Sequence, residues 1–412
     1  MIRATRTQWI KFAVVLALYL IFLVWLRSWL GLVVVPFIFD AYITKKIPWT
    51  WWRESKNRHV VTVMGWVDAI VFALVAVYFV NLYFFQNYVI PSSSLEKSLL
   101  TGDYLFVSKM SYGPRVPQTP LHMPLAQHTL PFFNCKSYLE HPQWDYKRVK
   151  GLGDVQLNDI VVFNFPAGDT VATGVPNDDI YRLSYGAGKE LAKPVDLASM
   201  TPEQQRVVYD YYYQLGREYL KENPQNFGEI ISRPVDRREN YVKRCVGLPG
   251  QTLEIKDRII YLDGKANKEP DNVQYRYLVK TKRPIPDDLA HELGISKEDM
   301  MMYYTDASVY NMPLTEKAKA GLLARKDIVV SIENTPADDA GGLYPLNMYK
   351  NWTTDNYGPV WIPKKGETVK LTIENLPVYE RPIHVYEGNE LAVKDGKIYI
   401  NGKETIQVRS YP

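Results

Sequence analysis

Two long apolar segments, residues 10–39 and 60–85, dominate the N-terminal part of the chain. A helix needs about 20 apolar residues to cross the hydrocarbon core of a bilayer. The second segment is long enough for one span, and Tyr78 and Tyr83 near its end are typical of the aromatic belts at membrane interfaces. The first is long enough for one tilted span, or for a helix followed by an interfacial or re-entrant piece. The sequence therefore predicts a membrane anchor over residues 1–86.

The loop between the two apolar segments, residues 41–59, is strongly basic. Loops rich in Lys and Arg stay on the cytoplasmic side of a membrane, so the second segment is expected to lead the chain to the outer face. The N-terminus also carries basic residues, and its side of the membrane stays open. Asp68, the only acid of the second segment, is expected to be hydrated or to pack between helices, with a functional intramembrane acid as the alternative. The basic residues of the loop are Lys45, Lys46, Arg53, Lys56 and Arg58.

Composition excludes several classes of function. A net charge of +4 is only mildly basic, and no dense Lys/Arg block with interleaved aromatic residues is present, so nucleic-acid binding is not expected. With two cysteines, Cys135 and Cys245, and six dispersed histidines, neither a disulfide framework, a metal site nor a cofactor is predicted. A single bridge between the two cysteines stays open.

Beyond the anchor, runs of β-branched and aromatic residues bounded by turn residues predict strands at 104–107, 160–163 and 259–262. Asp263-Gly264 after the third run is a hairpin signal. Thr201-Pro202-Glu203-Gln204 opens an amphipathic helix that runs to about Lys221. The fold class expected is transmembrane helices followed by a mainly β domain with α+β insertions. The predicted parts are the anchor (1–86), a core (87–167 and 240–265), an insertion with a helix (168–239), a second insertion (266–390) and a returning core strand (391–412).

Two short segments far apart in the sequence carry candidate chemistry. Three serines, Ser92 to Ser94, follow Pro91, and Lys243 lies in an apolar, strand-like run. A serine hydroxyl is a poor nucleophile unless a neighbouring group takes its proton, and a lysine can do so when burial keeps its amine neutral. Arg244, the next residue, would point to the opposite face of the strand. The alternative is that Lys243 and Arg244 are solvated charges and that the serines form a polar linker.

Four separated segments follow one another along the chain behind the predicted anchor. They are Ile90-Pro91-Ser92-Ser93-Ser94-Leu95, Leu100 to Lys109 with Tyr112-Gly113, Asn158 to Pro166, and Tyr241 to Gly250. In this order they resemble the boxes of the bacterial type I signal peptidases, membrane-bound Ser/Lys endopeptidases that remove signal peptides from exported proteins. Three positions depart from the family pattern: Leu95 replaces a methionine, Asn158 replaces the more usual glycine, and Gln251 replaces an aspartate.

The resemblance implies a signal-peptidase-like β fold and a role for six residues. Ser94 would be the nucleophile, Lys243 its general base, and the hydroxyl of Ser92 an oxyanion donor beside the backbone N–H of Ser94. Small apolar pockets would select small-x-small cleavage sites, with plain core packing as the alternative for their residues. Tyr88, Ile90 and Val242 are the residues assigned to these pockets.

The resemblance also implies partners and a location. The partners would be exported pre-proteins bearing signal peptides and the lipid bilayer, while the oligomeric state stays open. The location would be the bacterial inner membrane, with the catalytic domain on the outer, periplasmic face.

The family's last box, a Gly-Asp-Asn-Arg stretch followed by Ser and Asp-Ser-Arg, does not occur in the sequence. The chain ends at Val408 to Pro412, directly after a strand-like pattern. We expect a chain cut short of that box, with a relative that lost it as the alternative. Two functions therefore stay open: an active peptidase, or a membrane-tethered module that binds signal peptides or partner subunits without cleaving them. A self-cleaving repressor-type Ser/Lys hydrolase is disfavoured by the two apolar segments.

Overall fold

The computed structural model describes residues 4–133, 135–164, 170–176, 178–300, 308–336, 343–346 and 352–409. The chain divides into two compact units whose segments alternate along the sequence. Unit 1 comprises Met1–Ile90, Gly102–Val155 and Pro234–Glu239, and unit 2 comprises Pro91–Thr101, Gln156–Arg233 and Asn240–Pro412. Of the predicted segments, residues 165–166 and 410–412 lie outside the described residues.

Unit 1 begins with α1 (Arg6–Leu26), which ends at Arg27 in a left-handed conformation with φ +51°. The chain then turns and continues as a shorter helical stretch made of η1 (Leu30–Val34), α2 (Val35–Phe39) and η2 (Asp40–Thr44). The ring of Phe39 contacts Trp9 and Phe12 near the start of α1, so this stretch runs back along α1. The first apolar segment is therefore a long helix followed by a shorter apolar helical stretch, and how each meets the bilayer stays a prediction.

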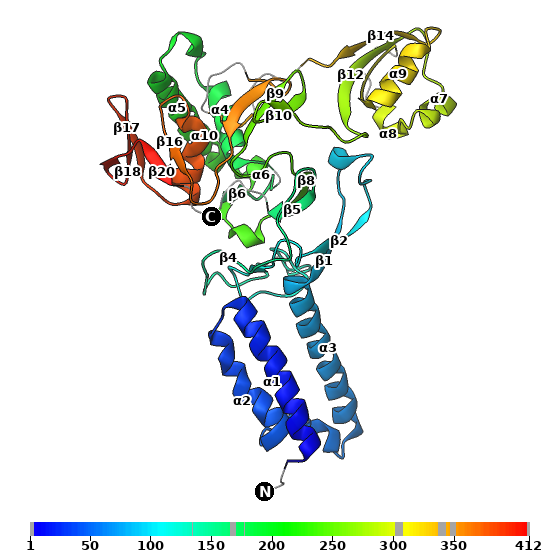
Figure 1. Ribbon diagram of the computed structural model, residues 1–412, viewed down its shortest axis with the longest axis vertical. Helices are drawn as coiled ribbons and strands as arrows, with labels where there is room; N and C mark the ends of the chain where they lie inside the picture. Colours follow the sequence, from blue (N-terminus) through cyan, green and yellow to red (C-terminus); the bar gives the residue numbers. More distant parts are fainter. Residues whose placement is uncertain are drawn as a thin grey trace. The chain divides into compact units, whose positions relative to one another are not determined.

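The second apolar segment is α3 (Arg58–Tyr83), close to the predicted bounds. Phe22 of α1 contacts Phe79 and Tyr83 of α3, so the C-terminal ends of the two helices lie side by side (Figure 1). Among the described residues, α1 and α3 are the helices long and apolar enough to cross a membrane. Arg53 of the basic loop forms an exposed ion pair with Asp68, and the role of this acid stays a prediction.

Short antiparallel strand pairs follow α3 in unit 1. β1 (Phe85–Val89) pairs with β2 (Tyr104–Ser108), so the strand before the serine cluster pairs with the second family-like segment. β3 (Arg115–Val116) pairs with β4 (Lys147–Arg148).

The predicted strands at 160–163 and 259–262 are present in unit 2. β5 (Ile160–Asn164) pairs with β8 (Asn240–Arg244), and a second pair joins β6 (Thr170–Ala172) to β7 (Ile230–Ser232). A four-stranded sheet has the order β11-β10-β9-β15. Asp263 and Gly264 between β10 and β11 both have positive φ, which confirms the hairpin signal. The strands of this sheet are β9 (Thr252–Lys256), β10 (Ile259–Leu262), β11 (Lys265–Ala266) and β15 (Tyr357–Trp361).

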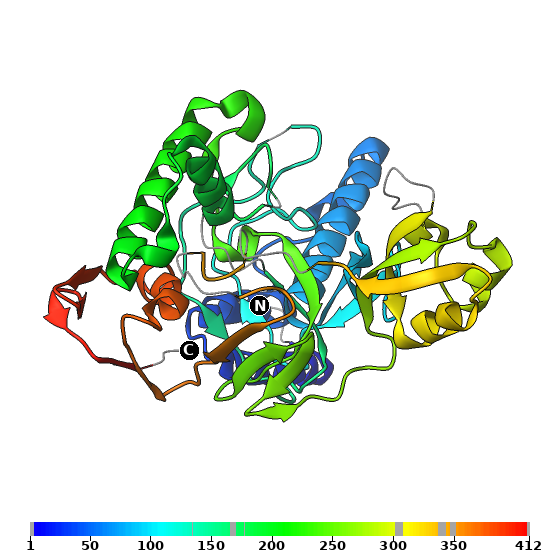
Figure 2. The same cartoon turned by 90° about the horizontal axis from the view of Figure 1, so that it is seen from above.

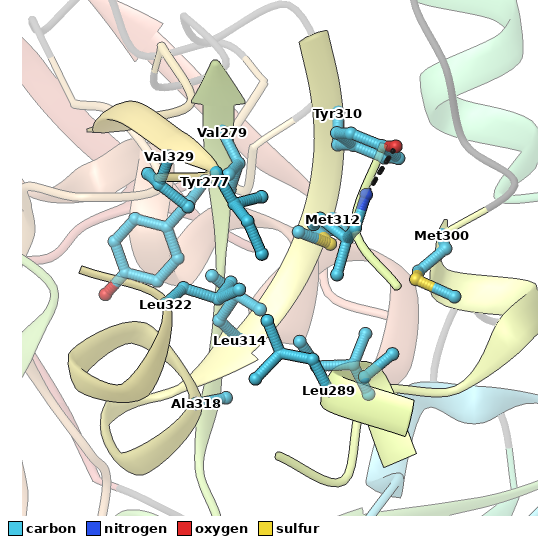
Figure 3. Packing of buried hydrophobic residues seen from close by; sticks show 14 residues of the cluster. Tyr277, Val279, Leu289, Met300, Tyr310, Met312, Leu314, Ala318, Leu322 and Val329 are labelled. Atoms are coloured by element: carbon cyan, nitrogen blue, oxygen red, sulfur yellow. Dashed lines mark hydrogen bonds between the residues drawn. The ribbon is translucent and has the colours of Figure 1, made fainter. Parts of the chain in front are cut away.

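Residues 274–300 and 308–334 of unit 2 form a small α+β body around its own core. Its three-stranded antiparallel sheet has the order β13-β12-β14, and Figure 3 shows how Tyr277, Met312 and Leu322 pack between that sheet and its helices. The elements are β12 (Gln274–Thr281), α7 (Asp287–Glu292), α8 (Lys297–Met300), β13 (Val309–Thr315), α9 (Glu316–Ala324) and β14 (Val329–Asn334).

The rest of unit 2 consists of short elements and a helical hairpin. The predicted helix at Thr201 is confirmed, since Thr201 and Gln204 form the reciprocal hydrogen bonds of a capping box. The helices are α4 (Ile180–Leu191), α5 (Pro202–Glu222), α6 (Pro224–Phe227) and α10 (Leu376–Arg381). The remaining strands are β16 (Thr368–Lys370), β17 (Leu391–Lys394), β18 (Lys397–Ile400), β19 (Lys403–Glu404) and β20 (Gln407–Arg409).

Helices α4 and α5 lie side by side and meet at two glycines (Figure 2). A Cβ built on Gly188 would lie 1.7 Å from the backbone oxygen of Tyr212. A Cβ on Gly216 would lie 1.7 Å from the backbone oxygen of Ser184. Real atoms do not approach so closely, so the helices can pack in this way only because both residues lack a side chain.

Replacing Gly188 by alanine is therefore expected to destabilise unit 2 by about 1–3 kcal/mol, because the helices must move apart. The matched control is Gly186→Ala in the same helix, where an added Cβ would meet nothing within 4 Å. Since alanine favours helix more than glycine, this control should be neutral or stabilising by up to about 1 kcal/mol. Thermal unfolding of the two variants side by side measures the difference, and equal midpoints would contradict the close packing.

Candidate active site

Ser94 lies in a short turn held by its own backbone. η4 (Ser93–Leu95) follows Ser92, which is extended at φ −144° and ψ 156°. The backbone N–H of Glu96 donates to the Ser93 oxygen at 2.9 Å, and that of Leu99 donates to the Leu95 oxygen at 2.8 Å. The side chain of Ser94 is exposed on this turn. Its hydroxyl is therefore accessible on the surface of this turn.

Lys243 lies on β8, where Val161 of β5 is its partner in the ladder. Two further backbone bonds close the end of the strand pair: Cys245 N–H donates to the Asp159 oxygen at 2.8 Å, and Asn158 N–H donates to the Cys245 oxygen at 2.7 Å. The third and fourth family-like segments are thus hydrogen-bonded to each other. The side chain of Lys243 is half-buried, a weaker burial than the apolar run around it suggested.

The decisive contact joins these two elements of unit 2. Lys243 Nζ donates to Ser94 Oγ at 2.5 Å, although the two residues are 149 positions apart in the sequence. Lys243 therefore has a specific side-chain partner, and its role as the base stays a prediction. The structure brings together the two residues whose chemistry the sequence pattern paired.

Arg244 holds the turn and the strand end together. Its Nη2 donates to Ser98 Oγ and its Nη1 donates to the backbone oxygen of Asn158, each at 2.9 Å. The sequence pattern predicted only that the Arg244 side chain would point to the opposite face of the strand from Lys243, and it did not identify the hydrogen-bond partners of Arg244. No sequence signal identifies them, because the bonds depend on how residues 91–101 fold onto β8.

Two of the three departures from the family pattern have a local explanation. Asn158 has φ +69°, a conformation that glycine adopts freely and that asparagine tolerates better than most residues. Gln251 accepts a hydrogen bond at its Oε1 from the backbone N–H of Leu248 at 2.8 Å, a bond that an aspartate oxygen could also accept. Both substitutions therefore keep the geometry around the end of β8.

The remaining predicted site residues fall in both units. Tyr88 is half-buried on β1, where burial raises the pKa of its phenol to about 12, so it stays neutral and is no candidate base at physiological pH. Ile90 is buried, and its backbone bonds to Asp103 and Gly102 fix its position. Val242 is half-buried opposite Val162. The pocket assignment of Tyr88, Ile90 and Val242 stays a prediction.

Cys135, in unit 1, and Cys245, in unit 2, are both free thiols in the structure. Within the part of the chain that the structure describes, no group of three or more His, Cys, Asp or Glu side chains is placed to hold a metal ion.

Comparison with known proteins identifies the family. The model of the family "Signal peptidase, peptidase S26" matches residues 63–291. Signal peptidase I P of Bacillus subtilis subsp. natto is 20% identical over 279 residues, which span 67% of this chain and 90% of that protein. Signal peptidase I of Helicobacter pylori is 42% identical over 56 residues, and that of Bacillus amyloliquefaciens is 30% identical over 93 residues.

Coverage of these relatives differs. The match to the Helicobacter protein spans 14% of this chain and 18% of that protein. The match to the Bacillus amyloliquefaciens protein spans 22% of this chain and 47% of that protein. No solved structure matches the chain significantly. The family match covers more than half of the chain and includes both Ser94 and Lys243, so the resemblance seen in the sequence is confirmed. The protein is a member of the signal peptidase family, peptidase S26, a family of proteolytic enzymes.

Proposed function

We propose that this protein is a membrane-bound serine endopeptidase that cleaves signal peptides from exported pre-proteins at small-x-small sites. The observation that carries the proposal is the 2.5 Å contact between Lys243 Nζ and Ser94 Oγ. A nucleophile and its base must lie within hydrogen-bond reach, about 2.6–3.2 Å between heavy atoms. The membership of a signal peptidase family supplies the substrate class.

The mechanism is acyl transfer through Ser94. With the Lys243 amine neutral, the Ser94 hydroxyl donates its proton to Nζ as its oxygen attacks the scissile carbonyl. The same proton then passes to the leaving amine, and an acyl-enzyme remains on Ser94 Oγ. Water, deprotonated by Lys243, hydrolyses this ester and regenerates the serine.

The anchor geometry supports a defined orientation in the membrane. Because Phe39 contacts Trp9 and Phe12, the start of α1 lies at the same end of the helices as the basic loop 41–59. Positively charged ends stay in the cytoplasm, so both the N-terminus and this loop are cytoplasmic in the proposal. α3 then crosses to the outer face of the inner membrane, where β1 begins.

Cleavage of a purified pre-protein with an Ala-x-Ala site, by the full chain in liposomes, tests the proposal. The expected result is one cut after that site, visible as a shortened product of defined N-terminal sequence. A pre-protein that binds but stays intact would support the alternative, a membrane-tethered module that holds signal peptides without cleaving them.

Ser92→Ala is expected to slow this cleavage by about two to three orders of magnitude, or about 3–4 kcal/mol of transition-state stabilisation. The reason is that the Ser92 hydroxyl would be one of two donors to the oxyanion, beside the backbone N–H of Ser94. Ser93→Ala, one position along the same turn, is the matched control and should cleave at nearly the normal rate. An inactive Ser93→Ala beside an active Ser94→Ala would show that the assignment is shifted by one residue.

A further inference from the structure

Residues 114–133 and 135–152 of unit 1 lie against the C-terminal ends of α1 and α3 (Figure 1). Trp25 Nε1 near the end of α1 donates to the backbone oxygen of Lys150 at 3.2 Å, and Lys147 Nζ donates to that of Arg27 at 2.9 Å. At α3, the hydroxyl of Tyr78 donates to the backbone oxygen of Pro120 at 3.2 Å. These contacts join the segment to the ends of both long apolar helices.

Within this segment, residues 121–133 and 135–139 form an irregular hairpin, called the hairpin arm below. Leu139 N–H donates to the Leu121 oxygen at 2.9 Å and Met123 N–H donates to the Ser137 oxygen at 2.7 Å. Near the tip, Leu130 N–H donates to the Cys135 oxygen at 2.8 Å. Hydrogen bonds between its own backbone groups therefore define the conformation of the arm.

The hairpin arm exposes apolar side chains along its length. Phe132 at the tip is fully exposed, and Phe133 and Leu125 are 79% and 76% exposed. Soluble surfaces rarely carry so many large apolar side chains in one place, and such patches mark binding to a membrane or to another protein. The other exposed apolar residues of the arm are Leu121, Met123 and Leu139.

Charge at the base of the arm favours a phospholipid surface as the partner. Arg27, Lys147 and Lys150 lie where the segment meets α1, and all three are exposed or half-buried. Cations beside exposed apolar groups are typical of structures that lie in the headgroup region, where they meet phosphate groups. Trp144 and Tyr146, both exposed, add the amphipathic aromatic residues that favour this region.

We propose that the hairpin arm dips into the outer leaflet of the bilayer, with Phe132, Phe133 and Leu125 among the acyl chains, as a second membrane attachment beside the two spans. This rests on the proposed membrane anchorage, because α1 and α3 bring the arm to the level of the interface. The partner is the phospholipid bilayer itself. The arm then restrains unit 1 near the surface from which a membrane-inserted substrate segment must emerge.

The test uses Cys135, which lies exposed near the tip of the arm, as the site of an environment-sensitive fluorophore. The full chain, with Cys245→Ser to leave one thiol, is reconstituted in vesicles of phosphatidylcholine and phosphatidylglycerol containing nitroxide lipids. A depth of about 5–10 Å below the headgroups predicts stronger quenching by a shallow than by a deep nitroxide, and a blue-shifted emission. Phe132→Ser with Phe133→Ser should abolish both effects; these side chains are exposed, so the change removes little packing.

A second probe separates this inference from the proposed function. Val71, an exposed residue in the middle of α3, is replaced by cysteine in a chain with Cys135→Ser and Cys245→Ser, and labelled in the same way. Lipid quenching at position 71 with only aqueous iodide quenching at Cys135 would overturn the arm's insertion and leave the anchorage intact. No lipid quenching at either position would overturn both. A Cys135 probe shielded from iodide and from lipid nitroxides would mean that a second copy of the protein covers the arm, and this too would overturn the proposal.

Discussion

Replacing Lys243 by alanine is expected to lower the rate of pre-protein cleavage by about four to six orders of magnitude, as for residues of other serine hydrolases that act as one unit. Without Nζ at 2.5 Å, nothing at this position takes the proton of Ser94 as its oxygen attacks. Ser94→Ala should have an effect of similar size. The double variant should fall no further, because the two side chains perform one step together. Single-turnover cleavage of the same precursor measures all three.

Lys243→Arg distinguishes a base from a mere positive charge. An arginine could still donate to Ser94 Oγ, but it does not lose its proton in proteins and cannot act as the base. This variant should therefore be as inactive as Lys243→Ala. Lys256→Ala, which removes an exposed lysine paired with Glu254, is the matched control and should retain activity. Substantial cleavage by Lys243→Arg would mean that the amine acts electrostatically and that another group is the base.

Short sequence motifs correctly predicted the helix cap and the turn whose conformations depend on only a few neighbouring residues. The capping residues at Thr201 and the Asp263-Gly264 turn specify backbone geometry within a few residues, so their structures agree with the sequence. The turn between β9 and β10 was not predictable in this way. Asp257 and Arg258 both adopt positive φ there without a glycine to signal it. Their conformation follows from the pairing of the two strands.

The burial of charged side chains depends on contacts between distant segments, so the sequence pattern did not predict which charged residues are buried. Lys109 ends the second family-like segment and reads as an ordinary strand-end lysine. In unit 1, burial together with the nearby charges of Arg115 and Arg148 lowers the pKa of its amine to about 8. The contact between Ser94 and Lys243 was predictable because the family pattern supplied the pairing of these two residues. The partners of Arg244, which tie the turn to β8, required the structure.

A buried polar cluster also joins distant segments of unit 1. Asp236 accepts hydrogen bonds from the backbone N–H and the hydroxyl of Thr119, both at 3.0 Å. Arg237 Nε donates to the same hydroxyl at 2.6 Å, and the guanidinium lies over the ring of Tyr138. Thr119, Asp236 and Arg237 are all buried. Burial lowers the pKa of Arg237 and the charge of Asp236 opposes that shift, so the carboxylate stabilises the buried cation.

Asp236→Ala is therefore expected to destabilise unit 1 by about 3–5 kcal/mol, because it leaves the Arg237 cation buried without its counter-charge. Asp236→Asn keeps an oxygen that can accept the hydrogen bonds from Thr119, so this variant should lose less stability than Asp236→Ala. The difference between the two variants separates the contribution of these hydrogen bonds from that of the negative charge. Native-state proteolysis of the full chain in detergent measures the change as faster cleavage within residues 114–152. Asp145→Ala, an exposed acid of the same segment, is the control and should be cut at the normal rate. If Asp236→Ala were cut no faster than this control, the cluster would not be what holds the segment in place.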